Sequence, residues 1–183
     1  MIERVKSSFG ILEKYYSTFV FEDYLDMFVD ELKGIKEHDE QYLFTFFQDY
    51  SNAERFHHPF SFHCVLHDML TAPLIKTSIV LFLRFLTSAE LRTKGDSFVH
   101  FLPDGFADIT HYCSSEVETM GRESEEIHIV ALATFLQVNV RVAHLDQSAT
   151  ESVNFHDYTF SPDTQEPFIT ILYRPGHYDL IYK

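Results

Sequence analysis

Cysteines and long apolar runs are both scarce in this chain. Two cysteines in 183 residues do not make a disulfide framework. The longest apolar run, 79–83, ends at Arg84 and is far too short to span a membrane. The first six residues lack the apolar stretch of a secretory signal peptide. These absences predict a cytoplasmic or nuclear protein that does not enter a membrane.

Basic side chains are half as numerous as acidic ones. The sequence has 14 Lys and Arg against 28 Asp and Glu, which gives a formal charge of −14. Such a surface repels phosphate backbones and anionic lipids, and this argues against a nucleic-acid-binding or membrane-binding function. The surface suits a cationic protein or peptide as a partner, or it serves only to keep the protein soluble.

Apolar and aromatic residues, by contrast, are plentiful. Hydrophobic residues make up 45% of the chain, with 19 Phe and 10 Tyr. This composition indicates a packed core and argues against global disorder. A chain of this length buries roughly two thirds of its unfolded surface. We therefore expect one globular domain, 1–183.

Helical periodicity dominates the first two thirds of the sequence. Apolar residues recur at helical spacing over 19–33 and again over 43–50. Residues 78–91 are apolar nearly all round, which predicts a buried helix. Ser124 is the expected N-cap of a further helix whose inner face extends to Phe135.

The last third is typical of strands. Valines alternate with polar residues over 138–142, which is the period of a half-buried strand. A polar stretch over 146–154 separates it from two further strands, 168–173 and 178–182, with a Pro-Gly turn between them. This order predicts an α+β fold with a small, mostly antiparallel sheet that ends in a C-terminal β-hairpin.

A histidine and an aspartate stand two residues apart near the start of the last strand. Residues i and i+2 of a strand project from one face, so Asp179 is placed to orient the His177 imidazole and to favour its charged form. Such a pair normally serves a cysteine or serine nucleophile. The spacing alone is also compatible with a surface histidine that has no catalytic role.

Four segments around these residues resemble the otubains, the cysteine deubiquitinases of the ovarian-tumour (OTU) superfamily. They occur in the family's order, and with the helix at 19–33 the resemblance covers most of 1–52 and 78–183. The Leu-Tyr-Arg-Pro-Gly-His-Tyr-Asp segment is the most specific of them. The four segments are Phe82–Ser88, Glu116–Ser124, Ile127–Ala133 and Leu172–Asp179.

The resemblance implies a papain-like OTU fold and a role for each residue of the last segment. His177 is then the general base toward a cysteine thiol, and Asp179 orients its imidazole. Arg174 and Tyr178 flank the proposed base and are expected either to line the channel for the C-terminal tail of ubiquitin or to be surface residues of the hairpin. The implied partners are ubiquitin, ubiquitin conjugates and ubiquitin-conjugating enzymes, and no cofactor is expected.

The sequence departs from the family in two places. It lacks the Asp-Gly-Asn-Cys-Phe motif that carries the otubain nucleophile on a central helix, so we expect an N-terminally truncated domain of marginal stability, without activity of its own. Neither Cys113 nor Cys64 is expected to replace that nucleophile. Residues 53–77 have no family counterpart and form an expected insertion. An alternative transcript or an imperfect gene model would leave both departures.

Two other functions stay open at this point. One is a non-catalytic module that binds ubiquitin or a ubiquitin-conjugating enzyme. The other is a metal-binding protein, because imidazole and thiolate groups cluster within the insertion and both suit zinc. The spacing matches no standard zinc finger, so we assign no metal ligand. The cluster consists of His57, His58, His63, Cys64, His67 and Asp68.

Overall fold

The computed structural model describes residues 2–37, 62–145, 153–160, 166–174 and 177–181. The chain forms two compact units, Met1–Phe85 and Leu86–Lys183. The long helix α5 contributes to both, because the boundary falls within it. In the described ranges, no helix combines the length and the apolar composition of a membrane span.

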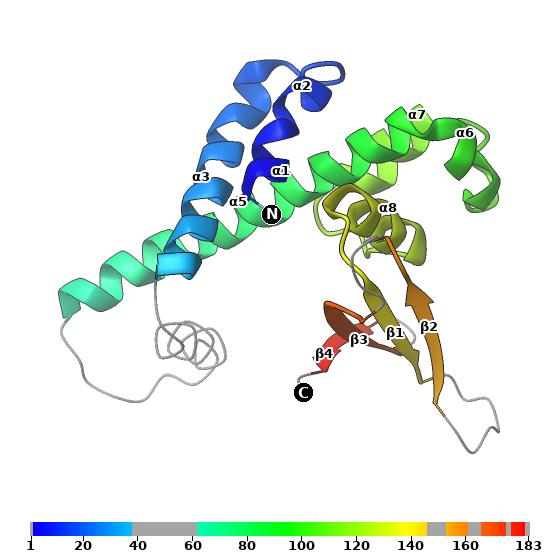
Figure 1. Ribbon diagram of the computed structural model, residues 1–183. Helices are drawn as coiled ribbons and strands as arrows, with labels where there is room; N and C mark the ends of the chain where they lie inside the picture. Colours follow the sequence, from blue (N-terminus) through cyan, green and yellow to red (C-terminus); the bar gives the residue numbers. More distant parts are fainter. Residues whose placement is uncertain (1, 38–61, 146–152, 161–165, 175–176, 182–183) are drawn as a thin grey trace. The chain divides into compact units, whose positions relative to one another are not determined.

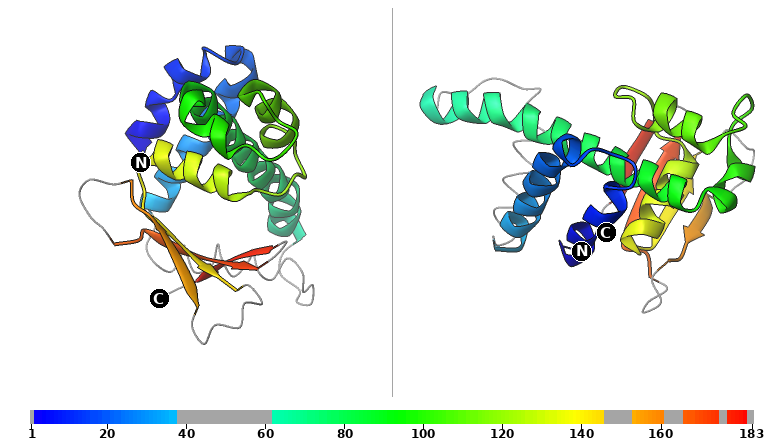
Figure 2. Two further views of the ribbon diagram at one scale, coloured as in Figure 1. Left: turned by 90° about the vertical axis from the view of Figure 1, so that its right-hand side faces the viewer. Right: turned by 90° about the horizontal axis from the view of Figure 1, so that it is seen from above.

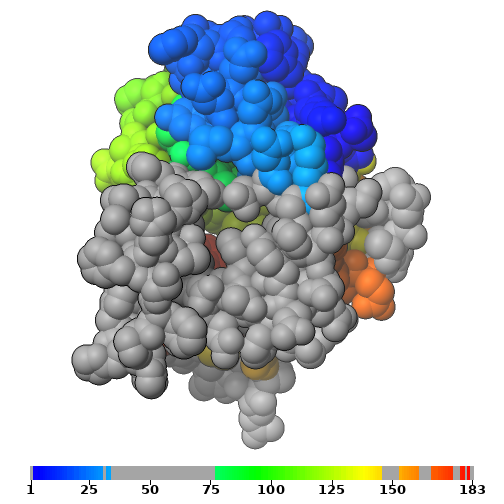
Figure 3. All heavy atoms as spheres, turned by 90° about the vertical axis from the view of Figure 1, so that its left-hand side faces the viewer, coloured from blue at the N-terminus to red at the C-terminus, as the bar shows by residue number. Residues whose placement is uncertain are grey.

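The first unit is built from helices (Figure 1). They are α1 (Ile2–Ser7), α2 (Phe9–Leu12), α3 (Thr18–Glu37) and the first part of α5 (Phe62–Thr93). Figure 3 shows the described side chains of α1 to α3, in blue, gathered into one continuous mass. The predicted helix over 19–33 is confirmed as α3, and the predicted helix over 43–50 lies outside the described residues.

Aromatic contacts hold this unit together. Phe21 is fully buried and meets the edge of Phe9, with 5.3 Å between the ring centroids. Phe82 of α5 is also fully buried and lies 5.4 Å from Phe28 of α3. Rings of this size supply much of the apolar area that a small helical core needs. The Phe content of the sequence is therefore used here for packing.

The helix α5 is longer than the sequence pattern predicts. It begins at Phe62 rather than Ser78, so its first half lies within the expected insertion at 53–77 and includes Pro73. Proline inside a helix removes one backbone hydrogen bond, which makes such an extension hard to predict from sequence. The second half agrees with the predicted buried helix, since Phe82, Leu86 and Leu91 are fully buried.

The second unit combines short helices, one longer helix and a sheet (Figure 2). After α5 come short helical segments, then the helix α8 (Glu126–Leu136). The short segments are α6 (Gly95–Phe98), η1 (Val99–Phe101), α7 (Ile109–Tyr112) and the π-helical turn η2 (Cys113–Val117).

Four strands form one mixed sheet in the order β2-β1-β3-β4. They are β1 (Val140–His144), β2 (Asn154–Tyr158), β3 (Ile169–Arg174) and β4 (His177–Ile181). The β1–β2 and β3–β4 pairs are antiparallel, whereas β1 and β3 are parallel. The α+β architecture with a small sheet and a C-terminal hairpin is confirmed.

The strand β2 was not predicted from the sequence. Its first four residues are exposed, so it lacks the alternation of apolar and polar side chains that reveals a half-buried strand. Pairing with β1 defines it instead, because Val140 lies opposite Tyr158 and Val142 opposite His156 in the register.

The helix α8 lies against one face of the sheet (Figure 2) and links two apolar clusters. Its Ile127 and Ala131 pack into a helical cluster with Leu91 and Tyr112. Its Ala133 packs with valines of β1 in a second cluster. The helix α8 is apolar nearly all round, which suits a helix that is covered on two sides. These contacts hold its N-terminal turn next to the sheet.

Candidate functional site

The β3–β4 hairpin carries the predicted catalytic pair. In its register, Arg174 lies opposite His177, and Leu172 lies opposite Asp179. The positions of His177 and Asp179 are therefore two apart on one strand, as the sequence predicts. Arg174 Nη2 lies 3.7 Å from Asp179 Oδ2, in an exposed ion pair. The side chain of His177 is outside the described part of the structure, so its catalytic role stays a prediction.

The other two predicted residues of the hairpin are not brought together. Tyr178 lies opposite Tyr173, and their ring centroids are 4.9 Å apart. Side chains alternate along a strand, so Tyr178 and Arg174 occupy positions that face opposite sides of the sheet. Desolvation by burial raises the pKa of Tyr178, and the nearby Tyr173 and glutamates contribute to the rise.

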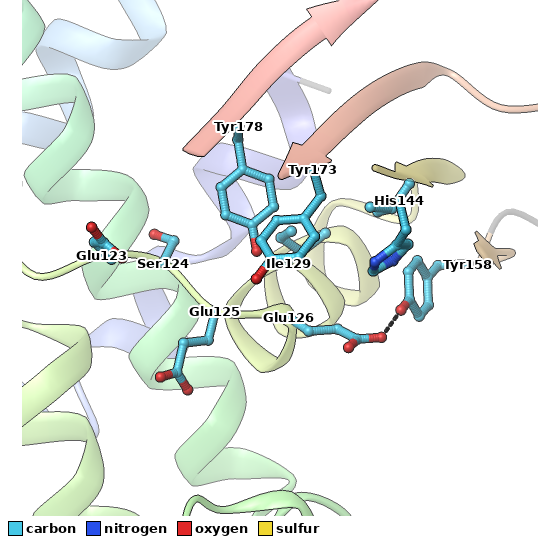
Figure 4. A pocket seen from close by; sticks show the side chains of 10 residues that line it. Glu123, Ser124, Glu125, Glu126, Ile129, His144, Tyr158, Tyr173 and Tyr178 are labelled. Carbon is cyan, nitrogen blue, oxygen red and sulfur yellow. Dashed lines mark hydrogen bonds between the residues drawn. The ribbon is translucent and has the colours of Figure 1, made fainter. Parts of the chain in front are cut away.

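Tyr178 lines a cleft of about 490 Å³ between the start of α8 and the sheet. One wall is acidic and comes from the loop and first turn of α8. The other is mainly aromatic and comes from the strands. Figure 4 shows Tyr173 and Tyr178 pointing from β3 and β4 toward the start of α8. The lining residues are Glu123, Ser124, Glu125, Glu126, Ile129, Val142, His144, Tyr158, Tyr173 and Tyr178.

Two polar features mark the far end of this cleft. The hydroxyl of Tyr158 donates a hydrogen bond to the carboxylate of Glu126, which joins β2 to α8 (Figure 4). Beside it, Nε2 of His144 is buried and has no hydrogen-bond partner within the described part of the chain. The centroid of the His144 ring lies 4.4 Å from the ring centroid of His156 and 5.2 Å from that of Tyr173.

The cleft suits a cationic ligand. Three glutamates supply negative charge, and the faces of tyrosine rings attract cations through their quadrupole. The buried imidazole nitrogen, which has no partner among the residues that the structure describes, offers a further hydrogen bond to a polar group. The sequence does not predict this part of the cleft, because only the pairing of distant strands brings together Tyr173, Tyr158 and His144.

The N-terminus of α8 differs in detail from the sequence prediction. Glu125 is the N-cap rather than Ser124. The Glu125 carboxylate accepts from the backbone N–H of His128, while the His128 ring accepts from the backbone N–H of Glu125. This capping box satisfies two backbone donors, the N–H of His128 and the N–H of Glu125. Ser124, one position earlier, satisfies neither of them. The prediction for Ser124 was therefore wrong by one residue.

Cys113 has the properties of a structural thiol. It is fully buried in η2, and its Sγ donates to the backbone carbonyl of Ser88 at 3.7 Å. Burial raises the pKa of this thiol, which lowers the fraction of reactive thiolate at neutral pH. The side chain of Cys64, in the first half of α5, is not among those the structure describes.

The histidine cluster of the expected insertion cannot be followed in the structure. His57 and His58 lie outside the described residues, and the side chains of His63, Cys64 and His67 do as well. Among the side chains that are described, no group of three or more His, Cys, Asp or Glu is placed to hold a metal ion. The metal-binding alternative therefore stays a prediction that the described residues do not test.

Comparison with protein families gives one match over the whole chain. The family model described as Peptidase C65 Otubain matches residues 1–183. Ovarian tumor domain-containing deubiquitinating enzyme 1 of Arabidopsis thaliana is 35% identical over 179 residues, covering 91% of this chain and 53% of that protein. Ubiquitin thioesterase OTUB1 of Homo sapiens is 31% identical over 179 residues, covering 97% of this chain and 56% of that protein.

Solved structures show the same relationship. A ceOTUB1 complex with ubiquitin aldehyde and UBC13~Ub matches with a TM-score of 0.73 and 25% identity, covering 99% of this chain and 65% of that chain. An h/ceOTUB1 complex with ubiquitin aldehyde and UBCH5B~Ub matches with a TM-score of 0.73 and 26% identity. The chain spans about half the length of the curated relatives it matches.

Proposed function

This chain belongs to the otubain family of C65 peptidases, and from that membership we propose that it forms the histidine-bearing part of a cysteine-type deubiquitinase. The substrate class is ubiquitin conjugates. The observation that carries the proposal is the hairpin, which sets His177 and Asp179 two positions apart on β4 within a chain that the family matches from 1 to 183.

In the proposed reaction, His177 removes the proton from a cysteine thiol, and the thiolate attacks the carbonyl carbon at the C-terminus of ubiquitin. The amine leaves with the proton that His177 returns, and an acyl-enzyme forms. Water then attacks this thioester, with His177 again as the base, and releases ubiquitin and the thiol. Asp179 holds the imidazole and favours its charged form during both steps.

Neither cysteine of the 183 residues is assigned the attacking role. The raised pKa and the burial of Cys113 oppose it. We therefore propose that these 183 residues bind ubiquitin without cleaving its conjugates. The acidic and aromatic cleft beside Tyr178 is the proposed seat for a basic part of the substrate, since its three glutamates and its tyrosine rings attract cations.

A non-catalytic role is the second candidate. The structural relatives were solved with ubiquitin aldehyde and with UBC13~Ub or UBCH5B~Ub, and they match 99% of this chain. A surface that binds ubiquitin or a ubiquitin-conjugating enzyme needs no nucleophile. Binding of a purified ubiquitin-conjugating enzyme would favour this role, because binding of ubiquitin is expected for both candidates.

The pairing of His177 with Asp179 is tested by NMR titration of the His177 ring in the full chain. Because a carboxylate favours the imidazolium, Asp179→Asn should lower the pH midpoint of His177. Asp157→Asn removes the same charge from β2 of the same sheet and serves as the control. Equal midpoints in wild type and Asp179→Asn would remove Asp179 from its proposed role.

Binding and cleavage are tested together with two reagents. A thiol-capturing ubiquitin probe should give no adduct with the 183 residues, whereas labelled ubiquitin should bind reversibly. The double variant Glu123→Gln/Glu126→Gln should weaken binding at least about fivefold, because the cleft loses two charges. Glu13→Gln/Glu22→Gln removes two exposed charges from the first unit and should leave binding unchanged. An adduct that disappears in Cys113→Ala would reverse the assignment of that thiol.

A further inference from the structure

A buried histidine outside the hairpin lies directly behind the acidic wall of the cleft. His128 occupies the first turn of α8 and is 7% exposed. Its Nδ1 accepts the backbone N–H of Glu125 at 2.7 Å. Its Nε2 lies 3.0 Å from the hydroxyl oxygen of Tyr112, and the two rings are stacked with centroids 5.7 Å apart.

These contacts assign the protons of the ring. A nitrogen that accepts an N–H carries no proton, so Nδ1 is bare and the neutral ring carries its proton on Nε2. Nε2–H then donates to the hydroxyl of Tyr112. Both ring nitrogens of His128 therefore have a partner, the N–H of Glu125 at Nδ1 and the hydroxyl of Tyr112 at Nε2.

A second proton on the ring is incompatible with this arrangement. It would go to Nδ1, where the N–H of Glu125 already points, and two donors would then face each other. The capping box of α8 would lose one of its two hydrogen bonds. The surrounding charges act in the opposite direction, because the carboxylates of Glu125 and of Glu116 near Tyr112 favour an imidazolium. Burial of the ring favours the neutral form.

The capped segment is also a wall of the cleft. Glu123, Ser124, Glu125 and Glu126 line it consecutively, and the N–H that His128 holds belongs to the third of them. We propose that His128 is a positioning residue, whose neutral ring keeps this wall in the shape that binds substrate and whose protonation releases it. The inference rests on the proposed function for its link to substrate, while its structural part concerns the chain alone.

The proton assignment is tested by NMR on the full chain. The ¹⁵N resonances of the His128 ring should show a protonated Nε2 and a bare Nδ1 at neutral pH. The Glu125 amide should be protected from hydrogen exchange. Its protection, corrected for intrinsic rates, should fall between about pH 7.5 and about pH 5.5 in step with the fraction of His128 rings that the ¹⁵N resonances show to be doubly protonated. A proton on Nδ1 at neutral pH would overturn the assignment.

Two substitutions separate the hydrogen bond from the charge. His128→Gln keeps an acceptor at the third helical position, as capping boxes commonly do, and takes up no proton. It should preserve protection of the Glu125 amide and abolish its pH dependence. His128→Leu has no acceptor and should speed exchange of this amide about fivefold, the equivalent of a lost cap. If His128→Leu does not fold, the His128→Gln profile decides the question.

His144→Asn is the matched control, because His144 is the histidine that lines the cleft. It should leave the pH dependence of the Glu125 amide intact. The role given to His128 would be overturned if the pH dependence of the Glu125 amide survived in His128→Gln or disappeared in His144→Asn.

Ubiquitin binding at the two pH values separates this inference from the proposed function. Wild type should bind more weakly at the lower pH, and His128→Gln should show a smaller loss. If both lose affinity equally while the exchange results hold, the coupling of His128 to the cleft is refuted. If neither binds at any pH, the proposed function fails, and the exchange results alone decide whether His128 holds the wall.

Discussion

Removal of the Arg92 guanidinium is the sharpest test of how the second unit is held together. Arg92 stands near the end of α5, and its Nη2 donates to Glu118 Oε1 at 2.8 Å. The hydroxyl of Ser88 donates to the same oxygen at 2.6 Å. Only 14% of the Arg92 side chain and 21% of the Glu118 side chain are exposed. The carboxylate is therefore largely desolvated and depends on these donors.

The structure sets the size of the effect. A hydrogen bond to a charged group contributes about 1.5 to 3 kcal/mol, and leaving one partner of a fully buried ion pair costs about 3 to 5 kcal/mol. Because Glu118 keeps Ser88 and some contact with water, we expect Arg92→Met to cost about 2 to 3 kcal/mol. Glu118→Gln keeps an acceptor for Ser88 but loses the charge, so we expect about 1 to 2 kcal/mol.

The assay is a double-mutant cycle followed by urea denaturation. The double variant Arg92→Met/Glu118→Gln buries no unpaired charge. Its loss in free energy of unfolding should therefore be smaller than the sum of the two single losses by at least about 1 kcal/mol. Lys33→Met is the matched control, since it breaks an exposed pair with Asp30 on α3. It should cost less than about 0.5 kcal/mol. Additivity within about 0.5 kcal/mol, or equal costs for Arg92→Met and Lys33→Met, would refute the reasoning.

Three further outcomes are expected. Because burial raises the pKa of the Cys113 thiol, its alkylation by iodoacetamide should be at least about tenfold slower in the native protein than in urea, as followed by peptide mass spectrometry. Hydrogen bonds from Arg141 lower the pKa of Asp157. The stability that they contribute is therefore complete above the ordinary carboxyl pKa and is lost as the pH falls through the lowered pKa. In an NMR titration, the pH midpoint of Asp157 should rise in Arg141→Gln. Val142→Ala leaves a cavity under α8 and should lower the free energy of unfolding, followed by a thermal melt, by about 1.5 to 3 kcal/mol. Phe101→Ser changes a side chain that is 72% exposed and should cost less than about 0.5 kcal/mol. Similar costs for the two variants would contradict the assigned core.

Local patterns determined much of the fold. The helix α3, the second half of α5, the helix α8, the strand β1 and the terminal hairpin were all predicted from the spacing of apolar residues and from turn chemistry. Such patterns are local because a helix or strand repeats its exposure to the core every few residues. The family could be identified for a related reason, since its most specific segment, Leu172–Asp179, is continuous in the sequence.

Only the tertiary structure decided which distant residues meet. The exposed strand β2 is defined by its pairing with β1, and that pairing places Tyr158 and His144 in the cleft. The stacking of His128 on Tyr112 joins the start of α8 to α7, sixteen positions earlier in the sequence. Side-chain periodicity carries no information on such contacts, because they depend on how packed elements cross and on the register of strands. The sequence thus supplied the elements and the family, and packing supplied the cleft and the hydrogen bonds behind its acidic wall.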